Sequence, residues 1–121
     1  MRVRGVRGAI TVAEDTKEEI LSATAELLQE MMARNALAHD DLVSILFTAT
    51  ADLHAMFPAE AARRIGIADI PLLCARELSV EGAMPQVIRV LMHAYTERDL
   101  ASVRHVYLRE AVSLRTDLAP E

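Results

Sequence analysis

The sequence of 121 residues contains few aromatic residues, cysteines or glycines. Aromatic residues make up 3% of the chain and tryptophan is absent, which argues against a surface on which nucleic-acid bases stack. The single cysteine, Cys74, excludes an internal disulfide and suits a reducing compartment, so we expect the cytoplasm. The four glycines lack the spacing of a phosphate-binding loop or a dinucleotide fingerprint.

Long apolar runs and excess positive charge are also missing. No apolar run approaches the roughly 20 residues that span a bilayer, and the arginines near the N-terminus are not followed by the apolar core of a signal peptide. The formal charge of −5 argues against nucleic acid or an anionic membrane as a partner. Because 52% of the residues are hydrophobic, we expect one folded domain over residues 1–121.

The hydrophobic pattern predicts five strands and two helices in the order β-α-β-α-β-β-β. Strands are expected over residues 2–12, 42–50, 70–78, 87–95 and 103–108. The alternation of the first strand slips near Gly5, which suggests a bulge or a close backbone approach.

Helix boundaries carry their own signals. Thr16 and Glu19 predict a capping box at the start of a helix that runs to about Arg34, with Asn35 as its end signal. A shorter helix is expected within residues 58–66, between a proline and a glycine. These elements predict an α+β fold, a small mixed sheet with helices packed on it.

The predicted strand over residues 87–95 is almost continuously apolar. A strand of this kind has no face suited to water, so helices or another subunit must cover it. Since only two helices are expected, we predict that subunit association covers part of the sheet.

Charged residues interrupt three apolar stretches: Arg7, Glu77 and Arg89. An unpaired buried charge costs several kcal/mol, so each needs a partner, a wet cavity or a ligand. For one such residue alone, the simpler interpretation is an ordinary salt bridge or a strand edge that reaches water. Three such residues in one short domain weaken that interpretation. Twelve of the thirteen basic residues are arginines, which a GC-rich genome explains in part, and the guanidinium fork also suits carboxylates and phosphates.

Motifs for other chemistries are weak or missing. The four histidines are scattered and lack the spacing of metal ligands, so we expect no metal or cofactor. Cys74 has no neighbour that marks it as a nucleophile. A Ser-His-Asp arrangement stays open, although no nucleophile-elbow motif supports it.

Several segments together resemble the AroH-type chorismate mutases. They are VRGVRGAITV (3–12), TADLHAMFPA (50–59), AAR (61–63), PLLCARE (71–77), IRV (88–90), VRHVYL (103–108) and LRTDL (114–118). The resemblance runs nearly end to end, in order and with little change in length.

The resemblance implies a cofactor-free isomerase that converts chorismate to prephenate in phenylalanine and tyrosine biosynthesis. It also implies a bacillus-chorismate-mutase-like homotrimer with a pseudo-α/β-barrel core and active sites between subunits. The implied principal polar residues are Arg7, Glu77, Arg89 and Tyr107. The implied pocket residues are Phe57, Ala59, Leu73, Cys74 and Leu114, with Arg63 and Arg115 at the cleft mouth. Glu60 departs from relatives that place a lysine there.

The reaction implied is an intramolecular Claisen rearrangement of a dianion, which transfers no proton and needs no nucleophile. An enzyme can hold the folded conformer and stabilise the charge that develops. The resemblance then implies that Arg89 donates to the ether oxygen and a carboxylate. Arg7 clamps a carboxylate with help from Tyr107, and Glu77 accepts from the ring hydroxyl and faces the positive fragment.

Two other functions suit a similar fold: a trimeric enamine/imine deaminase and a non-catalytic domain that binds small carboxylates. A purely structural oligomer is a further alternative, because fold alone does not determine function.

Overall fold

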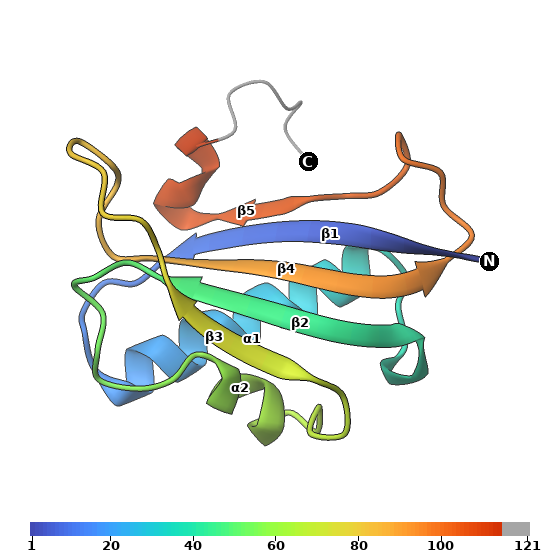
Figure 1. Cartoon of the computed structure of the whole chain (residues 1–121), viewed down its shortest axis with the longest axis horizontal. Coiled ribbons are helices and arrows are strands. Elements are labelled where there is room, and N and C mark those ends of the chain that lie inside the picture. The colour runs from blue at the N-terminus through green and yellow to red at the C-terminus, as the bar shows by residue number, and fades with distance from the viewer. Residues whose placement is uncertain (115–121) are drawn as a thin grey trace.

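The computed structural model describes residues 1–114, which form one mixed five-stranded sheet with its two α-helices on one side (Figure 1). The strands are β1 (Arg2–Thr11), β2 (Leu42–Ala49), β3 (Leu72–Arg76), β4 (Val87–Thr96) and β5 (Val106–Leu108). The helices are α1 (Lys17–Arg34) and α2 (Ala59–Arg64), with 3-10 helices η1 (His39–Asp41) and η2 (Arg109–Leu114). The strand order is β3-β2-β4-β1-β5. The predicted α+β fold and element order are confirmed.

The sheet is mixed because its two outer pairs are parallel and its inner pairs are antiparallel. β4 lies in the middle and runs antiparallel to both β1 and β2. β5 joins β1 in parallel, and β3 joins β2 in parallel. The two central pairings therefore fix which side chains of β1, β2 and β4 share a face.

Two predicted strands are too long. β3 ends at Arg76, so Glu77 lies just beyond the strand. The backbone N–H of Glu77 still donates to the Ala49 carbonyl at 3.1 Å. β5 starts at Val106 instead of residue 103, because the backbone of Arg104 is bound elsewhere. Its N–H donates to Asn35 Oδ1 and its carbonyl accepts from Asn35 Nδ2, both at 2.8 Å.

The bulge predicted near Gly5 is wrong. β1 and β4 pair without interruption from Arg2 opposite Thr96 to Thr11 opposite Val87, and the register shift lies in β2 instead. The close approach is at Gly8, where an added Cβ would lie 2.4 Å from Met31 Sδ of α1. Gly8 faces the helix layer whereas Gly5 faces the other side of the sheet, so only Gly8 needs to lack a side chain.

The boundaries predicted for α1 are confirmed, but both ends differ in detail. Thr16 Oγ1 accepts from the Glu19 N–H at 3.2 Å, while the Thr16 N–H donates to the Glu14 carbonyl, so half of the capping box forms. At the other end, buried Asn35 donates Nδ2 to the Met31 carbonyl at 2.8 Å. The Asn35 side chain therefore ends the helix. The left-handed backbone conformation that often follows a helix is adopted by Ala36, with φ 53°.

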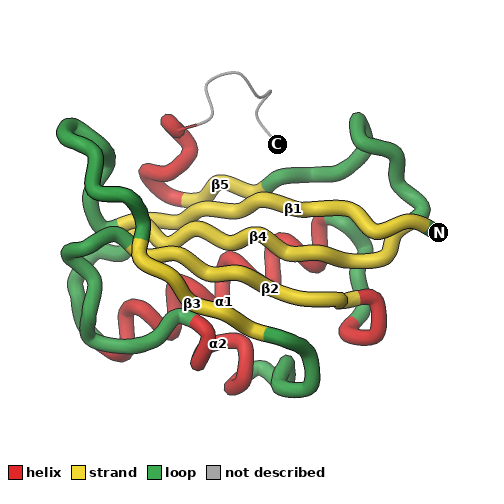
Figure 2. The backbone as a smooth tube through the Cα atoms, in the orientation of Figure 1, coloured by secondary structure: helices red, strands yellow, loops and turns green. Residues whose placement is uncertain are grey.

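The two faces of the sheet differ. Figure 2 shows α1 and α2 on the same side of the sheet, where buried side chains of β1, β2 and β4 pack against them. The largest members of this core include Phe47, Ile10, Ile88, Leu27 and Met31. Burying each such side chain contributes about 1.5–3 kcal/mol, so this layer dominates stability. On the opposite face, η2 buries Ala111 against Ala9 and Val87 at one end. No helix in residues 1–114 has the length and apolarity to cross a membrane.

Candidate active site

The strand register places a row of side chains across the face opposite the helices. Thr48 of β2 pairs with Arg89 of β4, Arg89 pairs with Ala9 of β1, and Ala9 pairs with Tyr107 of β5. Arg7 lies two residues from Ala9 on the same face, because side chains alternate along a strand. Four residues distant in sequence thus meet through backbone pairing alone.

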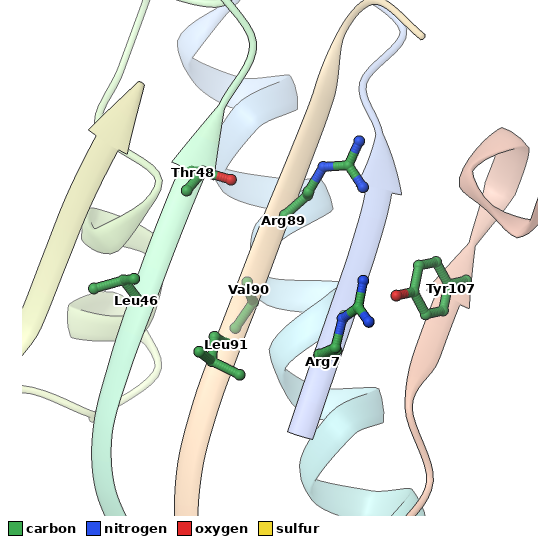
Figure 3. A pocket seen from close by; sticks show the side chains of 8 residues that line it. Arg7, Leu46, Thr48, Arg89, Val90, Leu91 and Tyr107 are labelled. Atoms are coloured by element: carbon green, nitrogen blue, oxygen red, sulfur yellow. The ribbon is translucent and has the colours of Figure 1, made fainter. Parts of the chain in front are cut away.

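These residues line a cavity of about 230 Å³ on that face. Figure 3 shows the Arg7 and Arg89 guanidinium groups over β1, with the Tyr107 hydroxyl pointing toward Arg7. Leu46 and Leu91 add apolar wall. The cavity thus combines planar cationic donors with an apolar surround, which suits a small organic anion.

Glu77 anchors Arg89 from the end of β3. Arg89 Nε donates to Glu77 Oε1 at 2.5 Å, and Thr48 Oγ1 donates to the same oxygen at 2.9 Å. The Glu77 side chain is 13% exposed and that of Arg89 is 38% exposed. A mostly buried carboxylate with two donors holds the guanidinium in one orientation more firmly than a surface ion pair does.

The electrostatic balance of the cluster is positive, since two arginines face one carboxylate. A guanidinium carries five N–H donors, and the bond to Glu77 uses the one on Nε. The terminal nitrogens of Arg89 extend into the cavity beside those of Arg7 (Figure 3). The planar fork of each guanidinium group can bind a carboxylate in bidentate fashion.

Of the other predicted pocket residues, Leu114 lies near this cluster. It packs, with Tyr107, against the small buried group of Ala9, Val87 and Ala111. η2 thereby connects the end of the described chain to the Tyr107 side of the site.

Phe57 and Cys74 line a second cavity, of about 440 Å³. This cavity lies beside the segment that connects β2 to α2 and shares no lining residue with the first. Phe57 is 71% exposed there, and Cys74 is half-buried against the helix-side core. Within one chain, the structure therefore separates these two residues from Arg7 and Arg89.

The remaining predicted residues are dispersed. Ala59 is buried in the helix-side core at the start of α2. Arg63 is exposed on α2 and pairs with Glu60 at 3.2 Å, and Glu60 also pairs with Arg64 at 3.4 Å. Leu73 is exposed beside Leu46, on the face that carries the first cavity. Arg115 lies outside the described residues.

Sequence reasoning missed Thr48. Like Ser44, it is a hydroxyl residue between apolar neighbours in β2, and its face follows only once the β2–β4 register is known. As for metals, residues 1–114 contain no group of three or more His, Cys, Asp or Glu side chains that could hold one.

Comparisons with known proteins assign the family. The family model described as "Chorismate mutase type I" matches residues 3–118. The chain belongs to the chorismate mutase type I family. It is 56% identical over 117 residues to chorismate mutase AroH of Thermus thermophilus, covering 96% of each protein. It is 44% identical over 120 residues to chorismate mutase AroH of Bacillus subtilis strain 168, covering 98% of this chain and 94% of that protein.

The solved structures agree with this family. A chorismate mutase from Clostridium thermocellum superimposes with a TM-score of 0.89 at 44% identity, over 91% of this chain and 98% of the other. The resemblance and the function predicted from sequence are therefore confirmed as those of a chorismate mutase, an isomerase. Neither the deaminase nor the non-catalytic binding domain is favoured.

Proposed function

We propose that this chorismate mutase converts chorismate to prephenate in the cavity lined by Arg7, Thr48 and Arg89, with Glu77 bound to Arg89, at a site completed by a second subunit. One observation carries the proposal. Arg89, central in the sheet, is oriented by Glu77 and extends its terminal nitrogens into the cavity.

The reaction sets what the cavity must supply. The substrate is a dianion whose C–O bond breaks as a C–C bond forms within the same molecule. No proton is transferred, so the residues contribute by holding the folded conformer and by stabilising developing charge. Negative charge gathers on the ether oxygen and positive charge on the ring.

In this proposal Arg89 donates from its terminal nitrogens to the ether oxygen and a carboxylate. Glu77 uses Oε1 to accept from Arg89 and Thr48, which leaves Oε2 for the ring hydroxyl. The Glu77 charge also faces the positive fragment. Both partners are set before the substrate arrives, so little reorganisation accompanies charge development.

Arg7 and Tyr107 bind the other side of the substrate. The Arg7 backbone N–H donates to His105 Nδ1 at 3.0 Å, which connects β1 to the residues before β5. With its hydroxyl turned toward the Arg7 guanidinium (Figure 3), Tyr107 shares a carboxylate with Arg7 in the proposal.

We propose that subunits associate through the face that carries the cavity, because large apolar side chains are exposed there, and the resemblance implies that the assembly is a homotrimer. Val3 is 47% exposed, Tyr95 46% and Leu73 61%, all on the side opposite the helices. A patch of this kind on a sheet face indicates a subunit interface. Association there brings the Phe57 and Cys74 cavity of one subunit to the Arg89 cavity of its neighbour.

In the proposed trimer the subunits surround a pseudo-α/β-barrel core. Arg63 lies at the cleft mouth, Ala59 helps to shape the pocket, and Leu114 borders Tyr107. The free Cys74 thiol suits work in the cytoplasm.

The test is the loss of chorismate absorbance with purified protein, measured together with mass by light scattering. The proposal predicts conversion to prephenate and a mass three times that of the 13.3 kDa chain. A folded assembly that leaves chorismate unchanged would overturn the proposed activity. An active monomer would overturn the shared site alone.

A further inference from the structure

The segment between β2 and α2, residues 50–58, carries Phe57 and forms much of the wall of the second cavity. It contains no helix or strand of its own. Leu53 is its buried anchor, at 5% exposure, while His54, Ala55 and Phe57 are exposed. The conformation of such a segment is determined by contacts from elsewhere in the molecule.

Asp15, just before α1, supplies those contacts at the centre of the segment. Its Oδ1 accepts from the backbone N–H groups of His54 and Ala55, both at 3.0 Å. Its Oδ2 lies 2.9 Å from His54 Nδ1. The Asp15 side chain is 22% exposed, so the carboxylate is mostly enclosed by the donors of this one segment.

The pKa of Asp15 agrees with this geometry. Burial acts to raise the pKa, but the N–H groups of Ala55 and His54 and the charge of His54 outweigh it and lower the pKa below its ordinary value. The ionised carboxylate is thus the form that the segment binds.

A second carboxylate fixes the start of the segment to β4. Asp52 accepts from the Gln86 N–H at 3.0 Å, and Thr50 Oγ1 accepts from the Val87 N–H at 3.0 Å. Val87 begins β4, two residues before Arg89. Residues 50–52 therefore move with the strand that carries Arg89, whereas residues 54 and 55 depend on Asp15.

We propose that Asp15 is a positioning residue that holds the 54–57 turn so that Phe57 closes over substrate bound in the neighbouring subunit's cavity. This inference rests on the proposed shared site. Without the carboxylate the turn samples other conformations, and the apparent affinity falls by the fraction that is competent. The groups that act on the breaking bond lie in other elements, so the loss appears in KM and not in kcat.

The direct test is Asp15→Ala, compared with Glu14→Ala as a control that removes a neighbouring exposed carboxylate. Asp15→Ala is expected to raise KM about tenfold with kcat within about twofold, and Glu14→Ala to leave both unchanged. Asp15→Asn keeps an acceptor for the two N–H groups and is expected to restore most of the affinity. A folded Asp15→Ala protein with wild-type KM would overturn the inference.

A double-mutant cycle with Phe57→Ala identifies the route of the effect. If Asp15 acts through Phe57, then Asp15→Ala changes KM little once Phe57 is already alanine. An equal proportional rise in both backgrounds would mean that Asp15 acts by another route, contrary to the inference.

Amide hydrogen exchange tests the turn without using activity. Asp15→Ala is expected to speed exchange of the His54 and Ala55 N–H groups at least about tenfold, while β4 amides keep their protection. Unchanged exchange would overturn the inference even in an active enzyme. Absence of chorismate conversion by the wild type would instead count against the proposed function.

Discussion

The cavity around Arg89 and the cavity beside Phe57 differ in what they offer a ligand. The cavity around Arg89 is small, about 230 Å³, and two guanidinium groups face it. The cavity beside Phe57 is about 440 Å³, and most of its lining side chains are apolar. In the proposed site the cavity around Arg89 binds the dianion and the cavity beside Phe57 encloses it, since charge interactions strengthen when water is removed. The fold places these halves apart in one chain, and in the proposed trimer the association of subunits joins them.

The largest expected effect is in the charged cavity. Arg89→Gln keeps a polar amide on a shorter side chain but loses the charge and the guanidinium fork, so kcat is expected to fall roughly 10²–10³-fold. Loss of chorismate absorbance measures it, with folding and assembly mass checked in parallel. Arg34→Gln on α1 is the matched control and should keep wild-type turnover.

Near-normal turnover by Arg89→Gln would remove Arg89 from the mechanism. Arg89→Lys tests whether a positive charge is sufficient without the shape of the guanidinium group. Lysine lacks the planar fork that lets Arg89 bind Glu77 through Nε and the substrate through its terminal nitrogens, so we expect most of the activity to be lost.

In the apolar cavity the expected effect is smaller and of another kind. Phe57→Ala removes an exposed ring that the proposal places over the substrate, so KM is expected to rise about tenfold, equivalent to about 1.4 kcal/mol, with kcat nearly unchanged. Steady-state kinetics separate the two constants. A fall in kcat at constant KM would mean that the two cavities do not differ in role.

The support of Glu77 can be tested with a smaller change. Thr48→Val removes the 2.9 Å hydrogen bond to Glu77 Oε1 at nearly constant shape. We expect kcat to fall about fivefold, equivalent to about 1 kcal/mol, and Thr48→Ser to recover most of it. Equal activities in all three proteins would show that Thr48 does not orient the carboxylate.

The smallest effect concerns acid stability. Because the folded-state pKa of Asp15 lies below 3.8, its ionised form adds stability above that pH and loses it as pH falls through the folded-state value. Urea unfolding should therefore show the gap between wild type and Asp15→Asn narrowing below pH 3.8. A constant gap would mean that the ionised carboxylate contributes nothing. Asp69 and Asp99, whose pKa values are also lowered, are common to both proteins.

Much of the fold followed from sequence because its signals are local. Thr16 and Asn35 bound α1 as expected, and the apolar runs located all five strands. The errors arose where tertiary contacts override pattern: Asn35 draws residue 104 out of the predicted fifth strand, and only the position of α1 distinguishes Gly8 from Gly5.

The site was predictable in part for the same reason. Arg7, Glu77 and Arg89 are charges in apolar stretches. The sheet register brings Arg7, Arg89 and Tyr107 to one face, and hydrogen bonds to Arg89 and Thr48 join Glu77 to them. Thr48 and Asp15 are ordinary in sequence, because their importance depends on partners distant along the chain.

Mixed assemblies test the shared site most directly. Arg89→Gln impairs the charged half, and Phe57→Asp places a repelling charge in the covering half, so each variant alone should be nearly inactive. In assemblies formed from equal amounts of both, some sites pair an intact Arg89 from one subunit with an intact Phe57 from its neighbour. Random mixing in a cyclic trimer predicts recovery of about a quarter of wild-type activity. Mixtures that stay as inactive as their components, despite confirmed subunit exchange, would contradict a site built from two subunits.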